Sequence, residues 1–432
     1  MKKEKIAIIG SGISGISSSL FLSKKYDIHL FEKNNYLGGH TRTKTLEDNN
    51  ILHDIDTGFI IFNNNNYPDL VKFFEYLNIN TLDSNMSFSI SIKDPEIEYG
   101  SSNLNALFAQ KKNLFSYRFW SLLIDIIKLY NHCKKISLLK NLEKYTIEDF
   151  LSRFNYSKNI RDLHIYPMIS CIWSCDRNLV EKFPLISFIN FFNNHRLFNI
   201  MNRQQWKFVE GGSHKYIQSV ISKNLFNYTK NKNVKNILRD KDKITIIFDN
   251  NEQFIADKIV LATHADQALR ILDQPTKNEI QILSKFKYSK NYAYLHSDNT
   301  FMPNRKSVWS SWNFLSKKDK DSSFSLTYWM NLLQNLQSKK NYFVSINPFS
   351  IPNQCHDQTI FEHPIFSLET LLMQKKINEI QGDLNTWFCG SYCGYGFHED
   401  GIQSAAYVAN LLGVKIPWNR PVNFVNRLQF IN

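Results

Sequence analysis

The sequence predicts an α/β protein of two interleaved domains, and three observations lead to this prediction. A strand, a glycine-rich turn, a helix and a second strand follow one another within residues 5–32. Further glycine motifs of the same kind come in the middle of the chain and near its C-terminal end. No linker rich in Pro, Gly or Ser separates these motifs. The segments between them are therefore expected to form a second domain inserted into the first.

The first motif lies between an expected strand at residues 5–9 and an expected helix at residues 16–25, and it reads Gly10-Ser11-Gly12-Ile13-Ser14-Gly15. In this pattern the first glycine allows a tight turn, the second lets the backbone approach a pyrophosphate, and the third lets helix and strand pack closely. The helix N-terminus offers unpaired N–H groups to phosphates. Glu32 ends the next strand, where a carboxylate can bind a ribose. The motif predicts a Rossmann-like dinucleotide-binding domain.

A second glycine pair, Gly38-Gly39, follows Glu32 closely and continues as His40-Thr41-Arg42. A domain that binds only NAD has no need of a second flexible turn here. A protein that binds extended FAD can use this segment to reach the phosphates and the ribityl chain. Arg42 suits phosphate because its planar guanidinium donates hydrogen bonds in pairs. The pair favours FAD, and the alternative is an ordinary exposed loop.

Later motifs fit the same domain. Glu210-Gly211-Gly212-Ser213 precedes an expected helix, and expected strands follow at residues 234–237, 243–248 and 259–264. Another expected strand ends at Gly390, and the run Gly394-Tyr395-Gly396-Phe397-His398-Glu399-Asp400-Gly401 leads into an expected helix at residues 402–412. Gly401 would bring that helix N-terminus close to a flavin ring, where its dipole stabilises negative charge on the reduced ring.

Together these motifs resemble the flavin-containing amine oxidase and desaturase superfamily over essentially the whole chain. The chain looks most like a bacterial group labelled only as NAD/FAD-binding or amine-oxidase-like proteins. The residues that carry this closer resemblance are Asp56-Thr57-Gly58-Phe59-Ile60, Tyr67-Pro68, Met86-Ser87-Phe88-Ser89, Trp206, Met302-Pro303, Trp309, Trp312-Asn313 and Tyr395 to Gly401. Genes of that group commonly lie beside genes for cyclopropane-fatty-acid-synthase-like methyltransferases. The resemblance therefore implies a lipid or fatty-acyl substrate and a methyltransferase partner.

The sequence departs from the superfamily pattern at three points. Amine oxidases usually carry Arg directly after the second glycine pair, where this chain has His40, so Arg42 is the better candidate for a phosphate contact. Some amine oxidases attach the flavin through a Cys before the last glycine motif, but no Cys lies between Cys355 and Cys389. We therefore expect non-covalent FAD. The lysine that many amine oxidases hold near the flavin has no clear counterpart, and Lys290 is the nearest candidate.

The candidate site residues follow from these motifs and from the resemblance. The residues expected to bind FAD are Gly10, Gly12, Ile13, Ser14, Gly15, Glu32, Lys33, Gly38, Gly39, His40, Thr41, Arg42, Thr57, Gly58, Val234, Thr263, Gly390, Gly401 and Ile402. For proton transfer the first candidates are His398 and Glu399, because they lie in the turn expected to face the flavin. In the structural alternative, Glu399 or Asp400 caps the following helix. His296 and Tyr166 are further catalytic candidates, and Asp56 is expected to order its loop.

The positions of the motifs divide the chain. The FAD-binding domain is expected from residues 1–62, 203–270 and 381–420, and the substrate domain from residues 63–202 and 271–380. Strand-like runs at residues 291–295, 323–329 and 342–346 predict an antiparallel sheet in the substrate domain. A helical stretch at residues 104–151 mixes aromatic and aliphatic residues with Lys and Arg. This mixture is typical of a helix lying on a bilayer, and the alternative is a core helix with a solvated basic face.

Composition narrows the class of protein. With 432 residues, of which 43% are hydrophobic, the chain can bury large cores. No apolar run reaches the ~18 residues of a membrane span, and the first strand leaves no room for a signal peptide, so we expect a cytoplasmic protein with reduced cysteines. The net charge is +13, but the basic residues are scattered without a nucleic-acid-binding motif, so peripheral contact with an anionic inner membrane face fits the charge better.

Six cysteines raise the question of a metal site. Cys171 with Cys175, and Cys389 with Cys393, form two C-x-x-x-C pairs whose spacing is compatible with zinc. The second pair lies inside the last glycine motif and the first in an apolar stretch, which favours buried thiols over metal ligands.

The sequence thus predicts an FAD-dependent oxidoreductase that dehydrogenates or otherwise remodels a lipid acyl chain. Three alternatives remain: a flavin-dependent isomerase that shifts a double bond, an oxidase of small amines, and a non-catalytic flavoprotein partner of a lipid methyltransferase.

Overall fold

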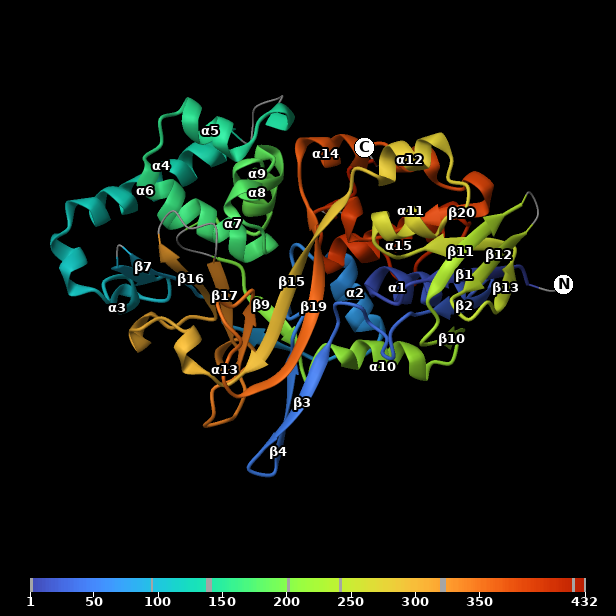
Figure 1. Ribbon diagram of the computed structural model, residues 1–432, viewed down its shortest axis with the longest axis horizontal. Helices are drawn as coiled ribbons and strands as arrows, with labels where there is room; N and C mark the ends of the chain where they lie inside the picture. The colour runs from blue at the N-terminus through green and yellow to red at the C-terminus, as the bar shows by residue number, and fades with distance from the viewer. Residues whose placement is uncertain are drawn as a thin grey trace.

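The computed structural model describes residues 3–94, 96–136, 142–199, 203–240, 243–318, 324–421 and 424–430. The chain folds into two parts that lie side by side, with the long strands β15 (Lys287–His296) and β19 (Cys355–Ile365) running between them (Figure 1). A hairpin of β3 (Thr43–Asp48) and β4 (Ile51–Asp56) projects from the boundary.

One part is built on a five-stranded parallel sheet with the order β10-β2-β1-β14-β20. The strands are β1 (Lys5–Ile9), β2 (Asp27–Phe31), β10 (Asn227–Thr229), β14 (Lys258–Leu261) and β20 (Thr386–Phe388). Nearly every residue of β1 and β14 is buried and apolar, as in a parallel sheet covered on both faces. The three segments expected to form the FAD-binding domain each contribute strands to this sheet.

The two faces of this sheet pack against different layers, because successive residues of a strand point to opposite sides. Ile6 and Ile8 face α1 (Ile13–Leu22), α2 (Pro68–Tyr76), α10 (His214–Ser222) and α15 (His398–Leu411). Ala7 and Ile9 face the small antiparallel sheet of β11 (Val234–Arg239), β12 (Ile244–Phe248) and β13 (Gln253–Ala256). Alternate apolar residues of β1 thus pack against the α1 layer on one face of the parallel sheet and against the small sheet on the other.

The other part contains a seven-stranded sheet with the order β19-β15-β18-β17-β16-β7-β8. Its remaining strands are β7 (Phe88–Asp94), β8 (Glu96–Gly100), β16 (Trp312–Lys318), β17 (Phe324–Trp329) and β18 (Phe343–Ile346). Strands β15, β17 and β18 lie where the sequence predicted them. The sheet is mixed rather than purely antiparallel, because β16 pairs with β7 in parallel through a long crossover.

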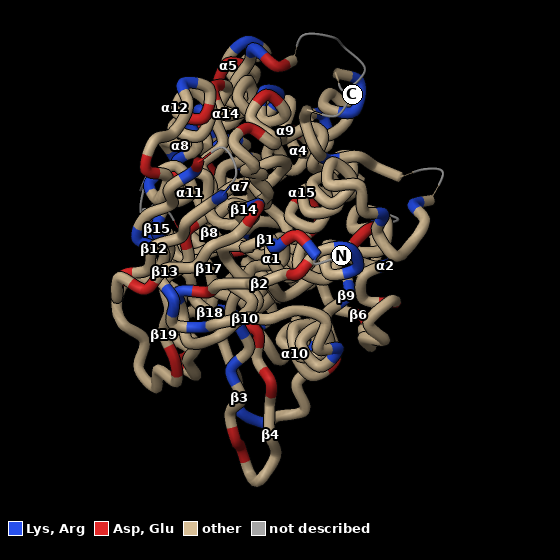
Figure 2. Tube along the Cα trace, turned by 90° about the vertical axis from the view of Figure 1, so that its right-hand side faces the viewer, with Lys and Arg blue, Asp and Glu red and all other residues tan. Residues whose placement is uncertain are grey.

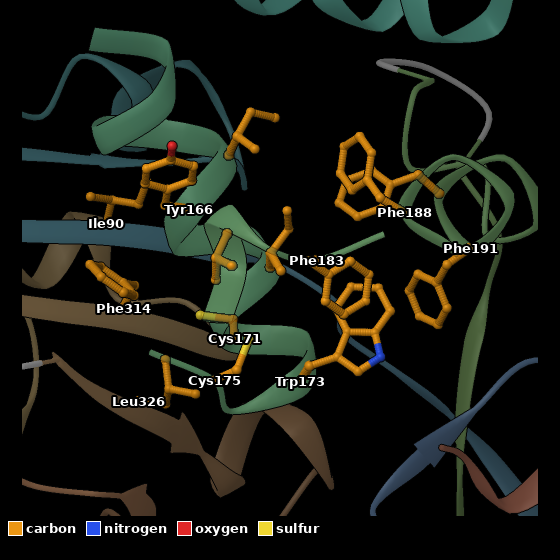
Figure 3. Packing of buried hydrophobic residues seen from close by; sticks show 14 of the residues in the cluster. Ile90, Tyr166, Cys171, Trp173, Cys175, Phe183, Phe188, Phe191, Phe314 and Leu326 are labelled. Atoms are coloured by element: carbon orange, nitrogen blue, oxygen red, sulfur yellow. The ribbon is translucent and has the colours of Figure 1, made fainter. Parts of the chain in front are cut away.

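The helical stretch expected at residues 104–151 is several short helices around one long helix. They are α3 (Leu104–Leu107), η1 (Lys111–Phe115), α4 (Tyr117–Ile136), η2 (Leu142–Lys144) and α5 (Ile147–Arg153). Residues 137–141 of that stretch lie outside the described residues. The helices pack on the sheet through a large apolar core, in which Trp173 lies beside Phe183 and Phe191 (Figure 3).

The remaining elements complete the two parts. The helices are α6 (Lys158–Ile160), α7 (Tyr166–Trp173), α8 (Arg177–Glu181), α9 (Leu185–Asn194), α11 (Ala265–Ile271), α12 (Lys277–Leu283), α13 (Met330–Leu333) and α14 (Leu368–Gln374). A π-helical turn, η3 (Arg161–Ile165), joins α6 to α7. A third small sheet has the order β5-β9-β6, from β5 (Ile61–Phe62), β9 (Trp206–Val209) and β6 (Thr81–Ser84). Short 3-10 turns are η4 (Asn299–Phe301), η5 (Lys306–Val308), η6 (Ile377–Ile380), η7 (Asp383–Asn385) and η8 (Ser391–Cys393).

Among the described helices, none combines the length and the apolar character needed to cross a bilayer. Cys171, Cys175, Cys389 and Cys393 are buried thiols, and burial raises the pKa of Cys389 to about 12. On the side of the molecule seen in Figure 2, Lys and Arg are interspersed with Asp and Glu. Charge on that side therefore forms no single basic stripe of the kind that nucleic-acid binding uses.

Candidate cofactor and active site

The glycine motifs gather at one edge of the parallel sheet. Gly10 and Glu32 directly follow the carboxyl ends of β1 and β2, and Thr263 and Gly390 lie two residues beyond the ends of β14 and β20. These strands are parallel neighbours, so the four positions lie along one edge. Ligands of open α/β sheets bind outside the carboxyl ends of the strands. The edge that carries these residues is therefore the candidate cofactor site.

The surroundings of the three glycines in the first motif are compatible with the roles predicted for them. Gly10 has a φ of +97°, and a Cβ there would lie 2.8 Å from the carbonyl oxygen of Ala262. A Cβ on Gly15 would lie 1.8 Å from the carbonyl oxygen of Gly10, so α1 packs directly on the turn. A Cβ on Gly12 would meet no protein atom within 4 Å. Bare backbone at Gly12, just before the N-terminus of α1, fits the approach of a pyrophosphate.

Glu32 is buried beside this turn. Its Oε2 accepts hydrogen bonds from the backbone N–H of Ser11 at 3.0 Å and from the Ser11 hydroxyl at 2.6 Å. Its Oε1 accepts one from the N–H of Asn34 at 2.9 Å. A carboxylate has about four acceptor sites, so capacity for a ribose hydroxyl remains. The backbone N–H of Lys232 donates to the Glu32 carbonyl at 2.9 Å, which brings the start of β11, with Val234, alongside.

The second glycine turn lies against the first. Gly39 has a φ of +59°, and a Cβ there would lie 3.2 Å from the Cα of Gly12. The N–H of Gly38 donates to the carbonyl oxygen of Ser11 at 3.1 Å. On the other side, a Cβ on Gly401 would lie 2.6 Å from Ile13. The N-terminal turns of α1 and α15 therefore touch, and both positive dipole ends meet at the two glycine turns. This arrangement fits a dinucleotide.

Arg42 is held by an acidic partner from the other part of the molecule. It forms an ion pair with Asp357 of β19, and its guanidinium also donates to the Thr57 hydroxyl at 3.3 Å. A Cβ on Gly58 would lie 2.1 Å from the carbonyl oxygen of His40, so the turn after β4 packs on this segment. A phosphate contact by Arg42 stays a prediction, and Asp357 fixes the position from which the guanidinium would make it.

His40 lies among aromatic rings. Its ring stacks on Phe361 with centroids 4.8 Å apart, and the rings of His363 and His264 are 5.4 and 6.4 Å away. Burial, reinforced by the neighbouring histidines, lowers the pKa of His40 well below its usual value. A hydrogen bond from His264 lowers the pKa of Glu362 to about 2. His40, directly after the second glycine pair, is therefore neutral at physiological pH.

His398 begins α15 and is buried. Its Nε2 is 3.0 Å from the Thr41 hydroxyl and 3.4 Å from the Tyr216 hydroxyl, and its ring stacks on Phe59 at 3.7 Å. Burial lowers the pKa of His398 to about 3. The side chain is therefore neutral at physiological pH, and it connects the second glycine turn to α15.

Glu399 and Asp400 make structural contacts. The carboxylate of Glu399 accepts hydrogen bonds from the N–H groups of Asp69 and Leu70 at 3.0 and 2.9 Å, which caps α2. Asp400 pairs with Arg427 at 2.9 Å and accepts the N–H of Phe397 at 2.7 Å. Both carboxylates are fully buried, and burial raises the pKa of each. Asp400 therefore caps the start of α15, as in the helix-capping alternative, whereas Glu399 caps α2 instead.

The other catalytic candidates lie apart from this group. His296 ends β15, where its two ring nitrogens contact the Ser345 hydroxyl at 2.8 Å and the N–H of Asp298 at 3.1 Å. Tyr166 begins α7, and its hydroxyl donates to Glu148 at 2.6 Å. The four candidates do not form one constellation. Lys33 and Lys290 are exposed.

Asp56 orders its loop as the sequence predicted. This fully buried carboxylate accepts hydrogen bonds from the Ser213 N–H and hydroxyl, the Thr43 hydroxyl and the Gln334 amide. It therefore connects the β3–β4 hairpin to the turn that contains Gly211 and Gly212. Burial raises the pKa of Asp56 to about 7.

Several residues at this site have no signal in the sequence. Tyr216, Asp357, Phe361, His363 and Arg427 belong to no glycine motif and lie far along the chain from the residues they contact. Tyr216 is two residues after an expected helix start, which is the one weak local indication. The others reach the site only because β19 and the C-terminal segment pass over it.

The neutral state of His398 gives a test by pH. Its folded pKa of about 3 lies below the ordinary value of 6.5. Above pH 6.5 the contribution of this group to stability is complete, and it is lost as pH falls toward the folded pKa, because only the unfolded chain takes up the proton. His398→Phe keeps a ring on Phe59 and removes the titration. Between about pH 6 and about pH 4, the unfolding free energy of the variant, measured in urea, should fall by ~1.4 kcal/mol less per pH unit than that of wild type. An unchanged slope would mean that His398 is protonated in the fold.

Comparisons with known proteins agree with this geometry. Residues 8–77 match the NAD(P)-binding Rossmann-like domain family. No curated protein matches the chain at the level of sequence. A CLA-producing fatty acid isomerase from P. acnes has a similar structure, with a TM-score of 0.69 and 13% identity over 96% of this chain and 99% of that one. Putrescine oxidase bound to putrescine gives a TM-score of 0.67 and 13% identity over 95% and 99% of the two chains.

Cyclohexylamine oxidase from Brevibacterium oxydans IH-35A gives a TM-score of 0.66 and 14% identity over 95% of this chain and 100% of that one. At these identities the likeness establishes the fold alone, which this chain shares with these enzymes over nearly its whole length. The chain therefore contains an NAD(P)-binding Rossmann-like domain within an amine-oxidase-like fold that covers nearly its whole length.

Proposed function

We propose that this protein is an FAD-dependent oxidoreductase that acts on a lipid acyl chain. The dinucleotide would be held by the two glycine turns, with Gly12 and Gly39 giving backbone access, Glu32 accepting from a ribose, and the N-terminal turns of α1 and α15 facing negative charge. FAD, when bound, supplies a two-electron acceptor for a hydride from substrate carbon. The second glycine turn, packed directly on the first, supports FAD over NAD.

The apolar surroundings of Phe397 carry the substrate proposal. Phe397 directly precedes α15, and its ring stacks on Phe191 with centroids 5.0 Å apart. Trp173 is 4.8 Å from Phe191, and its indole N–H donates to the carbonyl oxygen of Tyr395 at 3.3 Å. This aromatic wall joins the last glycine motif to the apolar core of the helical part. Walls of this kind favour an apolar substrate.

An amine cation fits the aromatic wall around Phe397 less well than an acyl chain does. Such a cation needs an aromatic cage or an anion. Three rings beside the last glycine motif do form a cage, but it already holds a cation: the Arg427 guanidinium is 5.3 Å from Tyr67, 5.3 Å from Tyr395 and 5.8 Å from Phe397. Asp400, the neighbouring carboxylate, is paired with the same guanidinium.

The chain's own residues would then position and shield the reacting carbon. Phe59 and Phe397 pack on the first turn of α15 and the wall behind it, which excludes water. His398 is neutral at working pH, and its hydrogen bond to the Thr41 hydroxyl would hold the second glycine turn in place. It could accept a proton only at a pH well below neutral.

A double-bond isomerase is the second candidate function, because a fatty acid isomerase is among the proteins with this fold. It would use the same cofactor residues and the same apolar wall. The difference is that the hydride returns to the substrate, so no electrons leave the protein.

The test is to add bacterial phospholipids, with and without methylated acyl chains, to the FAD-loaded protein without oxygen. Bleaching of the flavin absorbance is expected, with a new double bond in the lipid. Moved double bonds without bleaching would assign the isomerase, and bleaching only by putrescine or cyclohexylamine would overturn the lipid proposal. Gly12→Ala is the control: its φ of −62° and open surroundings allow alanine, so it should fold normally, bind no FAD and leave lipids unchanged.

A further inference from the structure

Large apolar side chains face solvent at the end of the molecule formed by α3, η1 and the first turns of α4. We call this surface the apolar tip, and it consists of Leu104, Leu114, Phe115, Tyr117, Trp120, Ile124 and Ile127. Phe115 is 92% exposed, Tyr117 88% and Leu104 73%. These elements lie at the left end of Figure 1, away from both chain termini. Large apolar side chains exposed together on consecutive elements are typical of an interaction site.

Helix α4 carries apolar residues on two opposite sides over its first four turns. Phe119, Leu122, Leu129 and Tyr130 are buried in the core of the helical part. Tyr117, Trp120, Ile124 and Ile127 are spaced by three, four and three residues, which places them on one face, and that face is exposed. A helix on the surface of a water-soluble domain normally presents polar residues there. The exposed face of α4 is thus built to contact something apolar.

The tip is held in a defined conformation. The indole N–H of Trp120 donates to the carbonyl oxygen of Leu114 at 2.9 Å, and the Trp120 ring lies 5.5 Å from that of Phe108. The N–H of Phe119 donates to the Ser116 hydroxyl at 3.3 Å, which secures the junction of η1 with α4. Because these contacts fix the backbone between η1 and α4, Phe115 and Tyr117 are presented outward.

Positive charge surrounds the tip. Lys111, Lys112, Arg118 and Lys128 are all exposed on the same segment. Two carboxylates on these elements are engaged elsewhere: Asp125 accepts the Ser157 hydroxyl at 2.7 Å, and Glu96 pairs with Arg305 at 2.7 Å. Arg118 donates to the neutral side chain of Asn159 at 3.1 Å, which leaves its charge unpaired by that contact. Lys112 lies 3.9 Å from Glu96, which is a weak surface contact. The cations therefore remain available to an anionic partner.

We propose that the apolar tip docks the protein on an anionic lipid bilayer. Phe115, Tyr117 and Trp120 would enter the boundary between headgroups and acyl chains, and Lys111, Lys112, Arg118 and Lys128 would bind headgroup phosphates. Aromatic and basic residues in one segment suit this interface. A second copy of the chain is a poorer partner, because a two-fold contact would bring the same cations together. The proposal holds whether or not the substrate is a lipid.

The test uses the full-length protein with bound FAD and vesicles of phosphatidylcholine, with and without phosphatidylglycerol. The protein is expected to sediment with the anionic vesicles and to be released by salt. Phe115→Ser with Tyr117→Ser should weaken this binding at least about tenfold, and the fold should survive because both side chains are almost fully exposed. Lys111→Ala with Lys112→Ala should weaken binding and reduce its dependence on salt.

The matched control lies at the tip of the β3–β4 hairpin, where Ile51 and Leu52 are 52% and 67% exposed but adjoin acidic residues. Ile51→Ser with Leu52→Ser should leave vesicle binding unchanged. The proposal is overturned if wild type fails to bind anionic vesicles, or if the Phe115/Tyr117 variant binds as wild type does. It is equally overturned if that variant instead dissociates a dimer in the absence of lipid.

Discussion

Gly15→Ala is expected to remove both the cofactor and much of the stability of the protein. The new Cβ would lie 1.8 Å from the carbonyl oxygen of Gly10 and 3.3 Å from the Cβ of Ala262. Backbone atoms cannot yield as a flexible side chain would, so α1 must move away from the turn between β1 and the helix. Overpacking against backbone should cost about 3 kcal/mol of unfolding free energy, the upper end of the usual range. Urea unfolding and the flavin absorbance of the purified protein would measure the two losses.

Gly12→Ala, three residues earlier, is the matched comparison. Because its added Cβ meets no protein atom, it should change the unfolding free energy of the FAD-free protein by no more than about 0.5 kcal/mol, although it blocks the cofactor. Equal stability of the Gly15 and Gly12 variants would contradict the close packing of α1 on the glycine turn.

Arg427→Met should lower the unfolding free energy by a similar amount, although Arg427 lies near the C-terminal end of the chain. Arg427 and Asp400 form an ion pair whose side chains are 2% and 0% exposed. Removing the cation leaves a buried carboxylate without its partner, at a cost of about 3–5 kcal/mol. The N–H of Arg427 also donates to Gln403 at 2.9 Å, so the C-terminal segment and the first turns of α15 should loosen together. Thermal unfolding and loss of FAD would both be measured.

Two further variants test whether the loss of stability comes from the unpaired charge of Asp400. Adding Asp400→Asn to Arg427→Met should restore part of the stability, because the amide oxygen can still accept the N–H of Phe397. Lys285→Met breaks an exposed pair with Glu369, whose side chains are 41% and 58% exposed, and should cost no more than about 1 kcal/mol. If the double variant were no more stable than Arg427→Met, shape rather than charge would explain the loss.

The cofactor edge of the parallel sheet could be predicted from the sequence because its determinants are local. Gly10, Gly12 and Gly15 act within one turn of their own strand and helix, and Glu32 ends the next strand. Strand β2 returns parallel to β1, so the spacing along the chain alone places Glu32 beside Ser11. The turn at Gly10, the close packing at Gly15 and the position of Glu32 therefore follow from short segments. Asp56, in contrast, orders its loop through Ser213 and Gln334, which are distant along the chain.

The residues that close the site over this edge could not be predicted in the same way. Asp357, Phe361 and His363 lie on β19, and Arg427 lies in the C-terminal segment. The β19 residues reach Arg42 and His40 through the packing of the two parts, and Arg427 reaches Asp400 because the C-terminal segment packs on α15. Glu399 could equally have been a proton carrier or a helix cap, and the position of α2 decides which N–H groups its carboxylate meets.

The exposed face of helix α4 could not be predicted from the sequence either. An apolar residue at helical spacing can face a core or the outside, and the sequence of α4 contains both kinds without distinguishing them. The glycine turns and the strands and helices that flank them could be read from short segments of the chain. The capping or pairing of each carboxylate, the cation in the aromatic cage and the exposed apolar face of α4 became evident only from the packed structure. The reason is physical: backbone conformation depends on near neighbours, whereas burial and pairing depend on contacts between distant segments.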